Sequence, residues 1–176
     1  TVTVEDNIPP TLVCQDVTLD LDENGTASNN PFLNGAFVSQ SDNCSVVGGL
    51  GVTGPGIYTC SNIGTFPISI IQDDPSGNET TCTYNVTVQD VTPPTAVCSG
   101  GATVYINASG IAPVDAAALD GGSTDNCTNT LTFSASPSTF GCGAVGSQPV
   151  TLTVIDGSGN TATCNTTVEV VDDEGP

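Results

Sequence analysis

The feature that most constrains the fold of this chain is an internal repeat of about 83 residues. All four cysteines of the first half recur in the second half, after 84, 83, 82 and 82 residues: Cys14 as Cys98, Cys44 as Cys127, Cys60 as Cys142, and Cys82 as Cys164. Short motifs recur with them, namely Asp-x-x-Pro-Pro at 6–10 and 90–94, Asp-Asn-Cys at 42–44 and 125–127, and Ser-Gly-Asn at 76–78 and 158–160. Such a period indicates tandem structural units.

The repeat divides the chain into four parts. We expect residues 1–6 to end a preceding repeat, residues 7–90 and 91–172 to form two repeats, and residues 173–176 to begin the next linker. There is no initiator methionine, no signal peptide and no apolar run near 18 residues. We therefore expect the chain to be part of a longer exported array.

Apolar residues alternate with polar ones over short segments, and turn residues lie between these segments. Val17, Leu19 and Leu21 show this period of two, as do Val150, Leu152 and Val154. A period of two predicts half-buried strands, and clusters such as Glu23-Asn24-Gly25 predict turns. The one helical segment we expect is about one turn at 115–119. We predict an all-β chain of two tandem Ig-like β-sandwich repeats.

The charge of the chain has a single sign. The 176 residues include 19 Asp and Glu but no Lys, Arg or His, giving a net charge of −19. Nucleic acids and anionic membranes are excluded as partners, because both require cationic side chains. Without His, Lys or Arg there is no Ser-His-Asp or Cys-His arrangement, no Schiff base and no phosphate clamp. A pair of catalytic carboxylates stays possible, but the Asp residues lie next to Asn, Gly and Pro in loops, so we predict that the chain is not an enzyme.

Eight cysteines without a Cys-x-x-Cys pair or a histidine favour extracellular disulfides over a zinc site. The first and last strands of an Ig-like sandwich lie side by side, which predicts the pairs Cys14–Cys82 and Cys98–Cys164. The remaining cysteines would then close short local loops, as the pairs Cys44–Cys60 and Cys127–Cys142.

These motifs resemble those of a known family. The order Asp-x-x-Pro-Pro, Asp-Asn-Cys, Cys-x-x-x-Gly and Ser-Gly-Asn-x-x-x-Cys resembles the hyalin-type repeats of bacterial surface proteins over essentially the whole chain. The likeness is greatest to the long repeat arrays of gliding-motility and adhesion filaments of Bacteroidota, exported by the type IX system. The resemblance implies a stalk or adhesin on a cell surface.

The direction of successive strands predicts where the acidic residues gather. Counting strands up and down brings Asp6, Asp42 and Asp74 to one end of the first repeat, and Asp90, Asp125 and Asp156 to the matching end of the second. Ca²⁺ takes six to eight oxygen ligands and is the natural partner of such a cluster. The predicted metal-binding residues are Asp6, Asp42, Asp74, Asp90, Asp125, Asp156, Asn126 and Asn160.

Two alternatives to this calcium site stay open. The acids of the clusters can simply cap turns and remain hydrated, since Asp is an ordinary turn residue. The segment 20–25 matches the first half of an EF-hand loop, but Pro31 stands where the final Glu belongs. A hairpin turn at Asn24-Gly25 is the better interpretation of that segment.

The sequence favours a non-catalytic structural or adhesive module of a secreted, cell-surface filament or stalk, stiffened by calcium. Its expected partners are neighbouring repeats of the same chain, self-assembly into filaments, or a surface ligand. The alternatives are a sugar- or protein-binding module and an accessory domain of a secreted hydrolase. Sugar binding is disfavoured because the chain has no Trp, three Tyr and five Phe.

Overall fold

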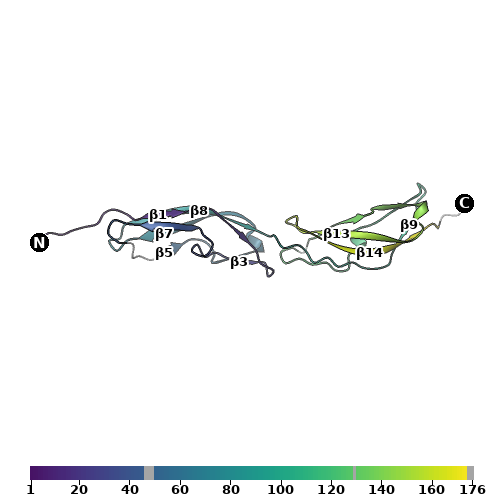
Figure 1. Cartoon of the computed structure of the whole chain (residues 1–176), viewed down its shortest axis with the longest axis horizontal. Coiled ribbons are helices and arrows are strands. Elements are labelled where there is room, and N and C mark those ends of the chain that lie inside the picture. Colours follow the sequence, from purple (N-terminus) through teal and green to yellow (C-terminus); the bar gives the residue numbers. More distant parts are fainter. Residues whose placement is uncertain (46–49, 129, 174–176) are drawn as a thin grey trace. The chain divides into compact units, whose positions relative to one another are not determined.

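The computed structural model describes residues 1–45, 50–128 and 130–173 of the chain. The chain divides into two compact units, unit 1 (Thr1–Asp90) and unit 2 (Val91–Pro176), which are described separately below (Figure 1). The expected start of a further linker at 173–176 lies mostly outside the described residues. Both units are built from strands, and the predicted all-β architecture is confirmed.

Unit 1 is organised around one four-stranded sheet with the order β2-β8-β7-β5. Two smaller strand pairs, β1–β4 and β3–β6, complete its strands among the described residues. The strand bounds are β1 (Thr11–Cys14), β2 (Val17–Asp20), β3 (Thr26–Ser28), β4 (Phe37–Ser41), β5 (Leu50–Val52), β6 (Ile57–Thr59), β7 (Gly64–Asp73) and β8 (Glu79–Gln89). β7 and β8 pair antiparallel along their whole length, whereas β2 joins β8 in parallel.

The core of unit 1 follows the period of two that the sequence shows. Ile68 and Ile70 of β7 are buried, and Val86 and Val88 of β8 are buried beside them, while the residues between them are more exposed. Successive side chains of a strand point to opposite faces, so only one face of this hairpin enters the core. Tyr58 closes the core and stacks on Phe66 at 6.1 Å between ring centroids.

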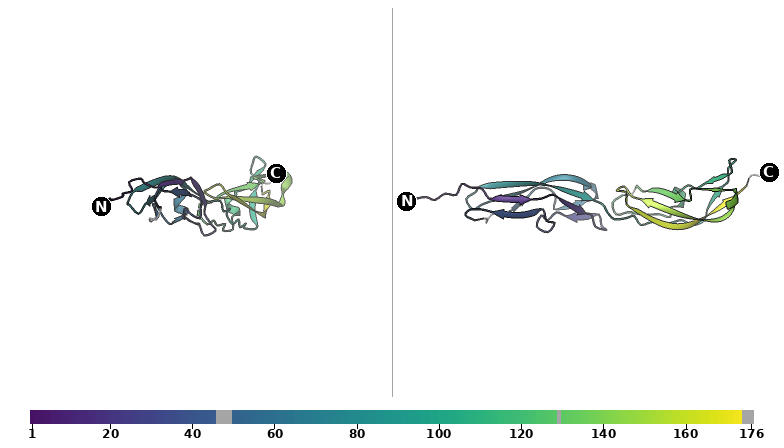
Figure 2. Two further views of the ribbon diagram at one scale, coloured as in Figure 1. Left: turned by 60° about the vertical axis from the view of Figure 1, so that its left-hand side comes forward. Right: turned by 45° about the horizontal axis from the view of Figure 1, so that its top comes forward.

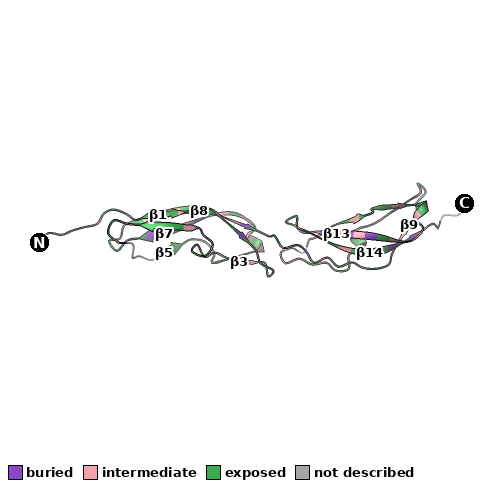
Figure 3. Cartoon of the chain, in the orientation of Figure 1, coloured by how far each residue is buried: buried purple, intermediate pink, exposed green. Residues whose placement is uncertain are grey.

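Unit 2 repeats this plan with a four-stranded sheet in the order β11-β13-β14-β9 and a smaller pair, β10–β12. Its strands are β9 (Ala102–Tyr105), β10 (Ile111–Pro113), β11 (Thr132–Ser136), β12 (Thr139–Gly141), β13 (Gly146–Ile155) and β14 (Thr161–Val171). The core is formed mainly by alternate residues of β13 and β14 (Figure 3): Val150, Leu152, Val154, Val168 and Val170. β14 joins β9 in parallel, as β8 joins β2 in unit 1.

The helical content described is three single turns of 3-10 helix: η1 (Cys60–Asn62), η2 (Ala117–Leu119) and η3 (Cys142–Ala144). η2 lies within the segment where the sequence predicts one turn. η1 and η3 occupy equivalent positions and lead directly into β7 and β13.

The long hairpins give each unit two distinct ends, a proximal end and a distal end. The proximal end of unit 1 carries the turn at 74–78, where β7 passes into β8, and the distal end carries Gly64 paired with Val88. In unit 2 the proximal end carries the turn at 156–160, and the distal end carries Gly146 paired with Val170. A strand rises about 3.4 Å per residue, so the two ends of a unit lie roughly 30 Å apart. The right-hand view of Figure 2 shows long strands running along each unit.

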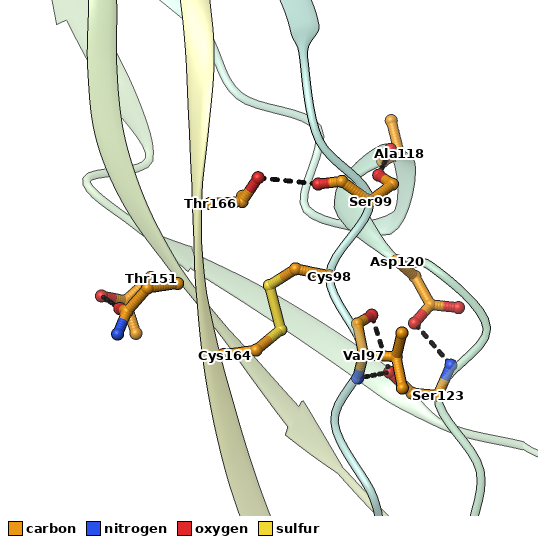
Figure 4. The surroundings of a disulfide bond; sticks show 10 residues. Val97, Cys98, Ser99, Ala118, Asp120, Ser123, Thr151, Cys164 and Thr166 are labelled. Carbon is orange, nitrogen blue, oxygen red and sulfur yellow. Dashed lines mark hydrogen bonds between the residues drawn. A yellow bond between two sulfur atoms is a disulfide. The ribbon is translucent and has the colours of Figure 1, made fainter.

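One disulfide within each unit ties its first strand region to its last strand. Cys14 bonds to Cys82 with 6.1 Å between the Cα atoms, and Cys98 bonds to Cys164 with 5.8 Å. Both are pairs that the sequence analysis predicts. Figure 4 shows the second bridge, where the hydroxyl of Thr166 also donates a 2.7 Å hydrogen bond to the carbonyl of Ser99.

The other two predicted pairs are wrong. Cys44 and Cys142 are free thiols, so neither Cys44–Cys60 nor Cys127–Cys142 forms. Cys44 lies at the proximal end of unit 1, where its amide donates to Asp42, whereas Cys60 lies beside Gly25 at the distal end. A disulfide requires Cα atoms about 4.4–6.8 Å apart. The length of the unit therefore prevents the local pair, although the two cysteines are near each other in sequence.

Candidate metal centres

Three carboxylates meet at the proximal end of unit 1. Asp6 precedes the first strand, Asp42 follows β4, and Asp74 begins the turn between β7 and β8. One oxygen from each lies within 4.8 Å of the others. The structure thus brings together the three residues named from strand direction, although they come from segments far apart in the sequence.

Asp42 uses only one of its two oxygens for the turn in which it sits. Its Oδ2 accepts the backbone N–H groups of Cys44 and Ser45 at 2.9 and 3.0 Å. Its Oδ1 is buried and has no hydrogen-bond partner among the described residues. A buried oxygen without a partner is costly, and most such groups in proteins are satisfied by protein, water or an ion.

Asp74 is held rigidly by the turn that it begins. Oδ1 accepts the N–H groups of Ser76 and Asn78, both at 2.8 Å, and Oδ2 accepts the Asn78 side chain at 2.7 Å. Burial raises the pKa of Asp74, but the hydrogen bonds from Asn78, Ser76 and Gly77 outweigh burial and bring the pKa below its ordinary value. Gly77 has φ of +88°, a conformation that a residue with a side chain rarely adopts. The carboxylate is therefore charged and fixed in place.

Asp6 is linked to both neighbours by asparagine side chains. Asn43 donates to Asp6 Oδ1 at 3.2 Å, and the Asn78 side chain donates to the backbone carbonyl of Asp6 at 3.0 Å. Asn78 therefore contacts both Asp6 and Asp74 and positions one relative to the other. Asn43 and Asn78 were not among the residues named from sequence, although both belong to the repeated motifs that could have indicated them.

The second cluster has the same construction around Asp125 and Asp156. Asp125 Oδ2 accepts the N–H groups of Cys127 and Thr128 at 2.9 and 3.0 Å, and its Oδ1 is buried without a hydrogen-bond partner in the described part of the chain. Asp156 accepts both the backbone and the side-chain N–H groups of Asn160, each at 2.8 Å. Asp90 supplies the third carboxylate, again within 4.8 Å of the other two.

The two asparagines predicted as ligands have different surroundings. Asn160 donates to Asp156 and so orients that carboxylate, as Asn78 orients Asp74 in unit 1. Asn126 is half-buried next to Asp125. Three carboxylate oxygens, one from each aspartate, converge in each cluster.

No side chain of the protein can neutralise these clusters, since the chain contains no Lys, Arg or His. Three like charges within 4.8 Å repel one another unless a cation lies among them. The donor set consists only of hard oxygens, which suits Ca²⁺ and gives no thiolate or imidazole for a softer metal. Asp6, Asp42 and Asp74 fit a calcium ion in unit 1, and Asp90, Asp125 and Asp156 fit a second ion.

The segment at 20–25 has the features of a turn. Asp22 Oδ1 accepts the N–H groups of Asn24 and Thr26, both at 2.9 Å, and Gly25 has φ of +69°. Hydrogen bonds from Thr26 outweigh burial and lower the pKa of Asp22. These contacts make the segment a tight turn, as expected at Asn24-Gly25, rather than an EF-hand loop. The turn does not close a hairpin, because β2 pairs with β8 and β3 pairs with β6 in a different sheet.

Cys44 lies directly beside the first cluster. The side chain of Asn43 is 3.4 Å from its Sγ and also donates to Asp6. A hydrogen bond with Asp6, burial, and the negative charges of Asp6, Asp42 and Asp74 all raise the pKa of the Cys44 thiol. These interactions favour the protonated thiol over the thiolate.

Comparison with known proteins shows that part of this chain is similar to a described family. Residues 89–170 match the HYR domain. The resemblance to hyalin-type repeats is thus confirmed for the second repeat, and the match supports a non-catalytic, extracellular, adhesion-type domain. A search of curated proteins finds no match. No helix in the described residues has the length and apolarity needed to span a membrane.

Several solved structures are similar to this chain at low sequence identity. Human protocadherin-24 EC1-2 superposes with a TM-score of 0.50 at 14% identity, covering 96% of this chain and all of that one. Human mucin-like protocadherin EC1-2 gives 0.39 at 12% identity, covering 93% and 98%. Sidekick-1 immunoglobulin domains 1–4 give 0.47 at 9% identity, covering 93% and 49%. The predicted fold class, two tandem Ig-like β-sandwiches, is confirmed.

Proposed function

We propose that this chain is a non-catalytic structural and adhesive module of a cell-surface filament or stalk, and that its repeats are stiffened by Ca²⁺ bound at their proximal ends. The tandem β-sandwich fold, the disulfide within each unit and the HYR match support an extracellular module of this kind. The calcium sites would be Asp6, Asp42 and Asp74 in unit 1, and Asp90, Asp125 and Asp156 with the half-buried Asn126 nearby for the second.

The observation that carries the proposal is an oxygen atom with the same surroundings in both repeats. Asp42 and Asp125 each turn Oδ2 toward two backbone N–H groups and leave Oδ1 buried without a hydrogen bond from any described residue. If these acids only capped turns, nothing would require the second oxygen to be buried beside two further carboxylates. A cation at each cluster would supply the missing partner of this oxygen and neutralise the charge.

Ion binding at this place would stiffen a repeat because the ligands come from separate segments. In unit 1 these segments are the residues before β1, the loop after β4 and the turn between β7 and β8. Side-chain hydrogen bonds from Asn43 and Asn78 link Asp6 to the other two segments. An ion with ligands from all three segments would prevent each from opening independently.

A sugar-binding role is less consistent with the aromatic residues. Of the three tyrosines, Tyr58 and Tyr84 are buried in the core of unit 1, and only Tyr105 is exposed. Phe32 is exposed but packs against Phe37 at 5.0 Å. Sugar sites commonly use exposed aromatic faces, which these residues supply sparsely.

Single-molecule force spectroscopy tests the mechanical role. We expect the force that unfolds each repeat to be higher in millimolar Ca²⁺ than in chelator, and the difference to vanish when both Asp42→Asn and Asp125→Asn are present. An unfolding force that is the same with Ca²⁺ and with chelator would refute the stiffening proposal.

A further inference from the structure

Two exposed cysteines remain free in a chain whose other cysteines are disulfide-bonded. Cys44 and Cys142 are both free and exposed. Their repeat equivalents behave differently, because Cys127, equivalent to Cys44, and Cys60, equivalent to Cys142, are each disulfide-bonded. The same two positions of the repeat therefore carry a bonded cysteine in one copy and a free thiol in the other.

Cys44 lies where the chain enters unit 1. Its neighbour Asn43 donates to Asp6, the first residue of the Asp-x-x-Pro-Pro motif, and its own amide donates to Asp42. Asp6, where a repeat joined before residue 7 would end, is therefore contacted by the residue next to Cys44. The exposed thiol therefore belongs to the proximal end of the unit, away from the core.

Cys142 lies at the end where the chain leaves unit 2. It begins η3, and its Sγ is 3.7 Å from the carbonyl oxygen of Gly110 in the turn that follows Ile106. The amide of Ile106 donates to the carbonyl of Val171, the last residue of β14, so this turn and the end of β14 lie together. The free thiol of Cys142 is thus at the distal end, beside the exit of the chain.

We propose that Cys44 and Cys142 are the two halves of a disulfide that joins successive repeats head to tail. Cys142 would bond to the Asp-Asn-Cys cysteine of a repeat that follows Asp172, and Cys44 would bond to the distal cysteine of a repeat that precedes Asn7. The inference rests on the tandem array in the proposed function but not on calcium binding. The disulfide would join each repeat to the next by a second covalent connection beside the linker. The linker and the disulfide would then share any pulling force.

The positions of the two cysteines suit a bond between successive repeats. Besides its internal disulfide, each repeat has one cysteine at its proximal end and one at its distal end, such as Cys44 and Cys60 in unit 1. The two ends lie roughly 30 Å apart, so these two cysteines of one repeat cannot bond to each other. The linker Asp-x-x-Pro-Pro is only five residues long and conformationally restricted, so its length limits how far the two cysteines of successive repeats can separate. A short tether gives the two thiols a high effective concentration.

Formation of the bond requires a disulfide donor of the thiol–disulfide oxidoreductase class, or oxidised glutathione in vitro. One thiolate attacks a sulfur of the donor to give a mixed disulfide, and the second thiolate displaces the donor thiol. The S–S bond of the donor breaks and the S–S bond between repeats forms. The two thiols lose two protons, and the donor is reduced to two thiols.

A tandem of the full chain tests the proposal by counting thiols. In this tandem, Asp172 of the first copy is followed by Asn7 of the second, which preserves the repeat spacing because Asp172 occupies the position of Asp90. After refolding with oxidised and reduced glutathione, thiols are titrated in denaturant. The single chain should show two, Cys44 and Cys142. The tandem contains four such cysteines. We expect it also to show two free thiols, because Cys142 of the first copy and Cys44 of the second copy would be bonded.

A single substitution changes the thiol count in opposite directions, depending on whether the two copies are joined by a disulfide. If Cys142 of the first copy is replaced by serine, the proposal predicts that the thiol count rises from two to three, since Cys44 of the second copy loses its partner. Without a bond between copies the count falls from four to three. Non-reducing peptide mapping should link Cys142 of the first copy to Cys44 of the second.

The inference is overturned by four thiols in the tandem, by none in the single chain, or by a map that pairs Cys44 with Cys60. Calcium binding by the same samples is measured separately. If the tandem binds Ca²⁺ and still shows four thiols, the disulfide inference fails while the calcium proposal stands.

Discussion

Replacing Asp42 and Asp125 by asparagine removes one proposed metal ligand from each repeat and little else. In each turn the remaining side-chain oxygen can still accept the two backbone N–H groups that Oδ2 accepts now, at 2.9 and 3.0 Å. The amide nitrogen would take the place of the buried Oδ1, and an amide N–H cannot coordinate a cation. The variant therefore keeps the turn and loses the ligand.

The size of the effect follows from mass action. When free Ca²⁺ is about 100 times its dissociation constant, one bound ion stabilises the folded unit by about 2.7 kcal/mol. For a domain of 60–100 residues, each kcal/mol raises the melting temperature by about 4–8 °C. We therefore expect Ca²⁺ to raise the melting temperature of the wild-type chain by about 10–20 °C, and the double variant to lose this gain.

The variant should behave in the opposite way in chelator. Removing one of three carboxylates within 4.8 Å relieves repulsion, so the double variant should melt at or above the temperature of the wild-type chain when Ca²⁺ is absent. The assay is scanning calorimetry with Ca²⁺ and with chelator at physiological salt. Asp22→Asn is the matched control, because Asp22 also caps a turn but belongs to the EF-hand-like segment, and its variant should keep the full calcium response. A wild-type melting temperature that ignores Ca²⁺, or a response lost in Asp22→Asn instead, would refute the reasoning.

Three further predictions follow from the geometry. Replacing both Cys98 and Cys164 by alanine opens a loop with a sequence separation of 66 and should lower the free energy of unfolding by about 4 kcal/mol, measured by urea denaturation. Alkylation of Cys44 by iodoacetamide should have its pH midpoint above that of an ordinary cysteine, because hydrogen bonding to Asp6 raises the thiol pKa; a midpoint at or below the ordinary value would contradict this cause. The pKa of Asp74, followed by NMR in chelator, should lie below the ordinary Asp value and rise in Asn78→Ala, and the stability that this carboxylate contributes should be lost only as the pH falls below about 4, toward its lowered pKa.

The main strands and the positions of the acids could be predicted because both depend on local pattern. Alternation at Val150, Leu152 and Val154 identifies a strand with one buried face, and the structure places all three in the core. Strand direction then decides at which end each loop lies. The acids Asp6 and Asp74 reach the same end because an even number of long traverses separates them, a property that the order of strands and turns reveals.

The pairs Cys44–Cys60 and Cys127–Cys142 were mispredicted because proximity in sequence was used instead of strand direction. Between Cys44 and Cys60 the chain passes from β5, which pairs with the proximal half of β7, to β6, which pairs with β3 beside the distal turn. The chain therefore crosses the unit once between these two cysteines. The same counting that gathered the acids would have separated Cys44 from Cys60.

Other features depend on side-chain geometry that no sequence pattern contains. The roles of Asn43 and Asn78 as links to Asp6 follow from how two loops pack, at distances of 3.2 and 3.0 Å. The orientation of Asp42, with one oxygen facing the backbone and the other buried, follows from the turn formed by Cys44 and Ser45. Sequence indicates that an acid is present there, but only the structure shows which oxygen is available.

The most direct test of the calcium proposal is the stoichiometry of Ca²⁺ binding to the whole chain. Isothermal titration calorimetry or equilibrium dialysis at about 0.15 M salt distinguishes bound ions from the diffuse counterions of a chain of net charge −19, because salt screens the diffuse attraction. The clusters at Asp6, Asp42 and Asp74 and at Asp90, Asp125 and Asp156 predict at least one saturable site each, and therefore no fewer than two bound ions per chain. These sites should disappear in the Asp42→Asn/Asp125→Asn variant. A wild-type chain that shows no saturable binding at millimolar Ca²⁺, or a double variant that binds as the wild type does, would contradict the account.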